Sequence, residues 1–292
     1  MRNLVHRYQD RTALNGVSFD VRPAELFGLL GPNGSGKTTL FRILSTLMVP
    51  TSGSATIAGL DAVRQPGALR RHIGVVFQAQ SVDPKLTAYE NLWHQGHLYG
   101  LRGTELKVRI NEILTRVGLL DRAGDLVETF SGGMQRRIEL AKGLLHHPEV
   151  LLLDEPTTGL DPIGTREMKD LILSLKAQGK TVLLCSHLLA DVQDVCDQIT
   201  ILFRGRMMEL SRDADGRPMG IAPVRDVLQI RDITNIETTG LNDAQIAELR
   251  EFLRRLGVNT PKVTHPTTTL EDLFMRVVKE NTGGNGRIQA GA

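Results

Sequence analysis

The sequence has few cysteines. Only Cys185 and Cys196 occur among 292 residues. Two cysteines are too few for a disulfide framework, and these two do not form a closely spaced pair of the kind that binds zinc. A chain of this composition fits a reducing compartment, so we expect a cytoplasmic protein.

Long apolar runs are also absent. The longest, such as VLLL at 150–153, have the length of a strand, whereas a membrane-spanning helix needs about 18 or more apolar residues. The first ten residues, MRNLVHRYQD, lack the apolar centre of a signal peptide. We therefore expect a soluble chain, and we expect another chain to supply the span if the protein acts at a membrane.

The chain has no marked excess of either charge. Its 35 basic and 33 acidic side chains leave a formal net charge of +2, so charge provides no argument for a nucleic-acid partner, and none is expected. Apolar residues make up 41 % and charged residues 23 %. That composition is ordinary for a globular protein with a substantial core.

Five short apolar runs predict buried strands. They are LFGLL (26–30), IGVVF (73–77), VLLL (150–153), TVLLC (181–185) and ITILF (199–203). Runs without alternation fit a parallel sheet covered on both faces, and the helical patterns between several of them favour an α/β fold. Residues 79–130 carry little strand signal and predict a helical insertion. Within it, 104–117 carries an apolar helical face of Leu106, Ile110, Ile113, Leu114 and Val117.

The composition changes after Gly205, which predicts a second, smaller unit. We expect a larger first domain over 1–210 with a helical subdomain at about 79–145, and a linker over 211–223, which mixes Gly, Pro, Asp and Ser. A small α+β accessory domain is expected over 224–280, with a strand at 224–233 and helices following Asn242 and at 270–279. Residues 281–292 are expected to be disordered.

The strongest local signal is a glycine-rich loop between a predicted strand and a predicted helix. It matches the phosphate-loop pattern G-x-x-x-x-G-K-[ST] and consists of Gly31, Pro32, Asn33, Gly34, Ser35, Gly36, Lys37 and Thr38. Its backbone amides and the following helix N-terminus can hold an anion. We expect Lys37 to reach the β- and γ-phosphates of ATP and the Thr38 hydroxyl to hold Mg²⁺.

Two carboxylates, Asp154 and Glu155, end the run at 150–153. Open α/β sheets bind ligands at the carboxyl ends of their strands, where the phosphate loop also lies. Asp154 is therefore expected to meet Mg²⁺, directly or through water, and Glu155 to orient and deprotonate the attacking water.

A second glycine-rich turn, Ser131-Gly132-Gly133, precedes another helical pattern and makes a second candidate anion site. One nucleotide cannot readily lie against two separate loops of one compact domain, so a second copy of the chain is the expected source of one of them. Gly159-Leu160-Asp161 follows Glu155 closely, and His187 closes the run at 181–185 at the same sheet edge.

Taken together and in this order, these motifs resemble the ATP-binding subunits of ABC transporters over about residues 1–210. GPNGSGKTT resembles the Walker A motif, VVFQAQ the Q-loop, FSGGM the signature, VLLLDE the Walker B motif, TTGLD the D-loop and SHLLADV the His switch. The resemblance implies a P-loop NTPase fold, a mostly parallel core sheet, and nucleotide contacts from Tyr8, Thr39 and the phosphate loop. It also implies that Thr38, Gln78 and Asp154 ligate Mg²⁺. Glu155 and His187 are the implied catalytic residues, and the implied contacts to the partner's nucleotide are Ser131, Gly132, Gly133 and Asp161.

The signature departs from the usual LSGGQ in Phe130 and Met134. The SGGM form, together with TLEDLF at 269–274, resembles the drug- and polyketide-exporter ATPases of the daunorubicin-resistance type. The chain has few residues before Tyr8, which predicts a missing or reduced first strand.

The resemblance implies a homodimer that sandwiches two ATP molecules and drives a separate ABC-2-type permease from the inner face of the membrane. A groove for a permease helix is expected near 78–93, with Val82, Leu86, Tyr89, Leu92 and Trp93 as candidate anchors; for Leu92 we expect packing inside the subdomain instead. Two alternatives stay open: a soluble ABC ATPase acting on ribosomes or DNA, and an importer subunit.

Overall fold

The computed structural model describes residues 1–187, 189–212 and 218–227. The chain divides into two compact units, 1–222 and 223–292. The predicted helices after Asn242 and at 270–279, and the predicted disorder at 281–292, lie outside the described residues.

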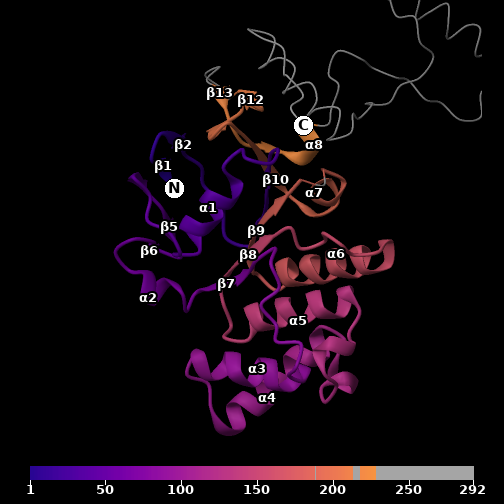
Figure 1. The fold of residues 1–292 in the computed structure, drawn as a ribbon. Coiled ribbons are helices and arrows are strands. Elements are labelled where there is room, and N and C mark those ends of the chain that lie inside the picture. Colours follow the sequence, from indigo (N-terminus) through magenta and orange to yellow (C-terminus); the bar gives the residue numbers. More distant parts are fainter. Residues whose placement is uncertain (188, 213–217, 228–292) are drawn as a thin grey trace, which may run out of the picture. The chain divides into compact units, whose positions relative to one another are not determined.

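The core of the first unit is the predicted sheet, in the strand order β11-β10-β3-β9-β8-β7. Figure 1 labels β7, β8, β9 and β10 of this sheet. All five apolar runs form strands in it: β3 Leu26–Leu30, β7 Ile73–Val76, β8 Val150–Asp154, β9 Thr181–Ser186 and β10 Gln198–Phe203. Neighbours among these five pair in parallel, and β11, Arg206–Met207, pairs antiparallel with β10. Off this path, β14, Ala222–Pro223, also pairs with β10. Because the parallel strands point the same way, the residues that follow β3, β8 and β9 meet at one sheet edge. The predicted α/β class is confirmed.

A separate antiparallel sheet, β2-β1-β4, contains the first strand. Strand β1 covers Arg2–Tyr8, β2 covers Arg11–Val17 and β4 covers Ser52–Ser54. The prediction of a missing or reduced first strand is therefore wrong. The β1–β2 hairpin is stabilised by Leu4, Leu14 and Val17, whose side chains are buried in the core.

The helices lie between the strands, as the α/β pattern requires. They are α1 Lys37–Leu44, α2 Pro66–Leu69, α3 Ala88–Leu98, α4 Gly103–Arg116, α5 Gly132–Leu144, α6 Pro162–Ala177 and α7 Leu189–Val195, with 3-10 turns at Leu120–Arg122 and Val127–Thr129. A small two-stranded sheet pairs β5 Thr56–Ile57 with β6 Leu60–Asp61.

The helical insertion contains α3 and α4, which pack against each other and against α5 (Figure 1). All five residues of the predicted apolar face, Leu106 to Val117, are buried. Helix α3 begins at a capping box: the Thr87 hydroxyl accepts from the Glu90 amide at 3.1 Å, and the Glu90 carboxylate accepts from the Thr87 amide at 2.8 Å. In turn, α5 packs on β7, which links this subdomain to the core sheet.

The stretch 211–223, predicted as a linker, contains three short strands: β12 Ser211–Arg212, β13 Pro218–Met219 and β14 Ala222–Pro223. The strand expected at 224–233 begins instead as a short helix, α8 Val224–Val227, and its remaining residues lie outside the described part. Pro223 has no amide hydrogen to extend a strand pairing, and Asp226 in the first turn favours a helix N-terminus.

Candidate active site

The phosphate loop joins β3 to α1. Gly36 precedes α1 with a φ of 112°, and a Cβ there would lie 2.5 Å from the Ala13 carbonyl oxygen, so this position requires glycine. Lys37 is buried and donates to the carbonyl oxygens of Gly31 and Pro32, the latter at 3.2 Å. Burial lowers the pKa of Lys37, and the charges of Glu155 and Asp154 oppose that shift.

A cavity of about 230 Å³ lies beside this loop. Its lining combines residues from the first hairpin, the phosphate loop and the ends of β7, β8 and β9. These residues are Tyr8, Arg11, Ala13, Pro32, Asn33, Gly34, Gly36, Lys37, Thr38, Thr39, Gln78, Asp154, Glu155 and His187. The fold thus brings together most of the residues that the sequence predicts for one nucleotide; Gly31 and Ser35 belong to the same loop but do not line the cavity.

Asp154 and Glu155 follow one another at the end of β8, and both are buried. Burial, and then the charge of Glu155, raise the pKa of Asp154; the charges of Lys37 and Arg136 act in the opposite direction. Asp154 is therefore costly to ionise at this position.

The Glu155 carboxylate is held by three side chains. Its Oε2 lies 2.8 Å from His187 Nδ1, and it accepts from the hydroxyls of Thr158 at 3.2 Å and Ser186 at 3.4 Å. The His187 side chain is 45 % exposed while that of Glu155 is 7 % exposed. The histidine can therefore contact a ligand in the cavity and the carboxylate behind it at once.

The second glycine-rich turn lies elsewhere in the chain's own fold. Ser131 caps α5, where its hydroxyl accepts from the Met134 amide at 3.3 Å. Asp161 caps α6 and accepts from the Gly164 amide at 2.6 Å. Among the described residues that line the cavity beside the phosphate loop, none comes from 131–133 or is Asp161.

Two residues of the cavity were not predicted. Arg11 and Ala13 come from β2, and Arg11 Nη2 donates to the Gly34 carbonyl oxygen at 3.1 Å. Neither belongs to a motif, and the close approach of the hairpin to the phosphate loop exists only in the folded chain.

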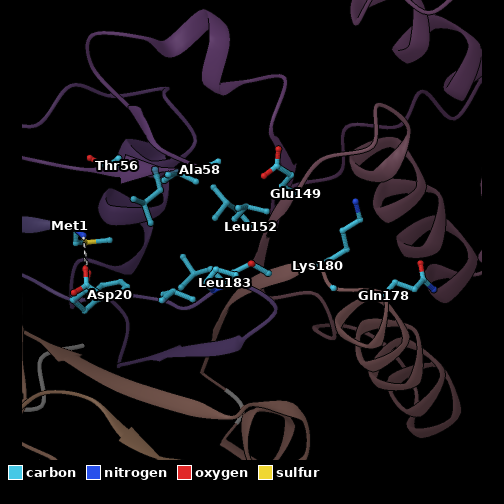
Figure 2. Close-up of a pocket in the computed structure, with 17 residues that line it drawn as sticks. Met1, Asp20, Thr56, Ala58, Glu149, Leu152, Gln178, Lys180 and Leu183 are labelled. Atoms are coloured by element: carbon cyan, nitrogen blue, oxygen red, sulfur yellow. Dashed lines mark hydrogen bonds and ion pairs between the residues drawn. The ribbon is translucent and has the colours of Figure 1, made fainter.

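A larger cavity, of about 360 Å³, is lined mostly by apolar side chains. Val150 and Thr181, which line it, are the first residues of β8 and β9, whereas the phosphate loop follows the last residue of β3. Figure 2 shows Glu149 and Lys180 beside this cavity, with Leu152 and Leu183 among its apolar walls. It lies at the opposite sheet edge from the predicted chemistry, so cavity size does not identify the active site here.

Comparison with known proteins agrees with the motifs. A family model described as ABC transporter matches residues 14–158. The chain is 37 % identical over 86 % of its length to the linearmycin resistance ATP-binding protein LnrL of Bacillus subtilis, of which 78 % is covered. It is 34 % identical over 98 % of its length to the daunorubicin resistance ATP-binding protein DrrA3 of Streptomyces coeruleorubidus, of which 96 % is covered. The chain belongs to the ATP-binding proteins of ABC transporters.

Solved ABC structures share the fold. A cassette called MJ0796, solved as a dimer in a post-hydrolysis state with ADP and Pi, matches with a TM-score of 0.64 and 29 % identity over 70 % of this chain and 94 % of that one. CbiO1 of Clostridium perfringens, described as part of an ABC transporter complex, matches with a TM-score of 0.68 and 26 % identity over 88 % and 95 %. This ABC protein is accordingly an ATP-binding and ATP-hydrolysing subunit. In the described part of the chain, no helix is long and apolar enough to cross a bilayer.

Proposed function

We propose that this ABC ATPase powers export of a drug-, lipid- or polyketide-like substrate through a separate ABC-2-type permease. The observation that carries the proposal is near-full-length similarity to DrrA3, named for daunorubicin resistance. Similarity to LnrL and to a Nod factor export ATP-binding protein of Neorhizobium galegae, 35 % identical over 92 % of this chain and 82 % of that protein, points the same way. The SGGM signature at 131–134 and TLEDLF at 269–274 add support for export over import.

Within the site, ATP binds with its phosphates against the loop from Gly31 to Thr38 and its adenine against Tyr8. Thr38, Gln78 and Asp154 line one cavity, and their side chains carry oxygen ligands of the kind that suits Mg²⁺. When bound, Mg²⁺ neutralises charge on the β- and γ-phosphates. Glu155 orients the attacking water and accepts its proton, and His187 contacts the γ-phosphate.

Two copies of the chain then enclose two ATP molecules, with the phosphate loop of one copy facing Ser131, Gly132, Gly133 and Asp161 of the other. The separation of Ser131 and Asp161 from the chain's own cavity supports this arrangement, since an isologous pair would supply both halves of each site. Binding closes the dimer, and hydrolysis with phosphate release reopens it.

Replacing the proposed base tests these roles. Glu155→Gln keeps the shape of the side chain but cannot accept a proton, so we expect steady-state hydrolysis to fall about 10²- to 10⁴-fold. ATP binding should persist, and the ATP-bound variant should elute as a dimer in gel filtration. Glu149→Gln, at an exposed acid outside the nucleotide cavity, is the matched control and should turn over normally. Near-normal turnover by Glu155→Gln would remove Glu155 from this role.

The proposed permease would hold the protein on the inner face of the membrane. Tagged protein extracted from its native membranes in detergent should co-purify with a polytopic permease, and a six-span permease encoded nearby without a solute-binding protein would support export. Recovery with ribosomes or DNA would instead support the soluble alternative. Recovery with an importer permease and its binding protein would overturn the exporter assignment.

We further propose that the catalytic domain occupies about 1–210, with residues up to Ala222 packed on it. We propose that 224–280 form an accessory domain that assists regulation or assembly, the latter by a contact between the two copies of the chain. Every motif assigned to ATP lies before Ile199, which supports a catalytic role for the first part of the chain alone.

A further inference from the structure

Arg136, in the second turn of α5, is a buried arginine whose hydrogen bonds go to backbone carbonyls of other segments. Its Nη1 donates to the Phe77 oxygen at 2.6 Å, and its Nη2 to the oxygens of Asp154 at 2.7 Å and Glu155 at 3.0 Å. Its Nε donates to the Pro156 oxygen at 3.2 Å. One planar guanidinium therefore joins the end of β7 to the residues that end and follow β8.

Glu155 has a backbone conformation that needs such support. Its φ is +51°, in the left-handed region that non-glycine residues rarely adopt. Such a conformation persists where surrounding bonds over-determine it. Here the Glu155 amide donates to the Cys185 oxygen at 2.9 Å, and its carbonyl oxygen accepts from Arg136. These two bonds hold the peptide groups on either side of Glu155.

The same helix also holds the segment that follows Gln78. The Glu139 carboxylate accepts from the Ser81 hydroxyl at 2.7 Å and from the Val82 amide at 2.8 Å. Lys142 donates to the Ser81 carbonyl oxygen at 2.6 Å. Helix α5, which begins at the signature turn, is thus bonded to the chain on both sides of Gln78, through Phe77 and Ser81, and to the backbone of Glu155.

We propose that Arg136 is a positioning residue for hydrolysis: it holds the Glu155 backbone so that the carboxylate faces the attacking water, and it makes that placement depend on the position of α5. The proposal rests on the proposed role of Glu155 as the base. Movement of α5 would shift Phe77 and Glu155 together through one guanidinium.

The test compares Arg136→Gln and Arg136→Lys with Arg109→Gln and Arg109→Lys. Arg109 is an equally buried arginine that donates to the oxygens of Leu144 at 2.8 Å and Leu145 at 2.9 Å, and it does not line the nucleotide cavity. All four variants should melt at lower temperature than the parent. We expect Arg136→Gln to lower kcat about 10²-fold, the loss that a misplacement of about 1 Å can cause, with ATP affinity little changed. Arg136→Lys should lower kcat less, because lysine retains the charge but not the planar fork.

The Arg109 variants should keep kcat per folded molecule. In a Glu155→Gln background, Arg136→Gln should cause no further loss of the residual rate, since both changes act through one carboxylate. Equal kcat in the Arg136 and Arg109 variants, or additive losses in the double variant, would overturn the inference while leaving the base in place. Normal turnover by Glu155→Gln alone would instead contradict the proposed role of Glu155 as the base. If Arg136→Gln fails to fold, Arg136→Lys against Arg109→Lys decides the same question.

Discussion

Among single residues, Asp154 shows most clearly that the site is built at a cost to the fold. Its carboxylate is buried beside Glu155, and burial raises its pKa. The folded protein therefore binds a proton at Asp154 more tightly than the unfolded chain does. Ionising this residue at neutral pH lowers the free energy of unfolding, and that penalty vanishes below the unfolded pKa of about 3.9.

We therefore expect Asp154→Asn to raise the melting temperature of the nucleotide-free protein at pH 7. The gain should shrink as the pH falls through the folded pKa and disappear near pH 4 or below. Hydrolysis should fall, by about 10- to 100-fold or more, because an oxygen proposed to face Mg²⁺ loses its charge. Calorimetry across pH, together with an ATPase assay, measures both effects.

Asp20→Asn is the control of opposite sign. The hydrogen bond from Arg2 lowers the pKa of Asp20, so its loss should not stabilise the protein at neutral pH. A melting temperature of Asp154→Asn at or below that of the parent at pH 7 would contradict the electrostatic argument.

Among the elements, α3 combines a fully packed face with an exposed aromatic. Leu92 is 0 % exposed, which confirms that it packs inside the subdomain, whereas Trp93 is 40 % exposed. The Trp93 ring lies 4.0 Å, between centroids, from His97 one turn later. An exposed, pre-ordered tryptophan is suited to anchor a partner helix.

We predict that Trp93→Glu uncouples transport from hydrolysis. Basal ATPase activity and the circular dichroism spectrum should stay near those of the parent. Transport in membranes with the permease should fall at least about tenfold, as for loss of an interface anchor worth about 1.4 kcal/mol or more. Tyr89→Glu tests the neighbouring half-buried anchor in the same way. Val108→Glu places the same charge at an exposed position on α4 and should leave transport intact. Normal transport in both the Trp93 and Tyr89 variants would rule out this docking surface.

In the molecule as a whole, the first compact unit ends at Ala222, later than the boundary of 210 expected from composition. The buried hydroxyl of Thr200 donates to the Gly220 oxygen at 2.7 Å, the Ser211 hydroxyl donates to the Ile221 oxygen at 3.0 Å, and Ala222 is 1 % exposed. Gly220, Ile221 and Ala222 therefore pack within the first unit.

A chain ending at Ala222 should hydrolyse ATP at the full-length rate. A chain ending at Leu210 should be less stable by about 1–3 kcal/mol, since the buried Thr200 hydroxyl loses its acceptor. Urea unfolding and ATPase assays compare the two. Loss of nucleotide binding by the chain that ends at Ala222 would contradict the assignment of ATP chemistry to the first unit. If that chain sediments without nucleotide as the full-length chain does, a dimer contact beyond Ala222 is excluded.

Local pattern was sufficient for the parts of this protein whose physics is local. Unbroken apolar runs predicted all five parallel strands, because a strand buried on both faces needs apolar residues at every position. The apolar face from Leu106 to Val117 predicted α4 for the equivalent reason at helical spacing. The glycine-rich loop predicted the connection between β3 and α1, because glycines allow the backbone conformations of a tight loop; that it holds phosphate stays a prediction.

The tertiary structure alone decided which distant residues share a site. No sequence pattern brings Arg11 to the Gly34 carbonyl, or Arg136 to the carbonyls of Phe77 and Glu155. A carbonyl acceptor is present at every residue, so only the packing of α5 against β7 selects which ones Arg136 meets. The first strand was underestimated for the same reason, because its stability comes from burying Leu4 against Leu14 and Val17 rather than from its own length. The sequence alone therefore predicts the features that depend on neighbouring residues, whereas the bonds that hold the proposed catalytic carboxylate form only once the chain has packed.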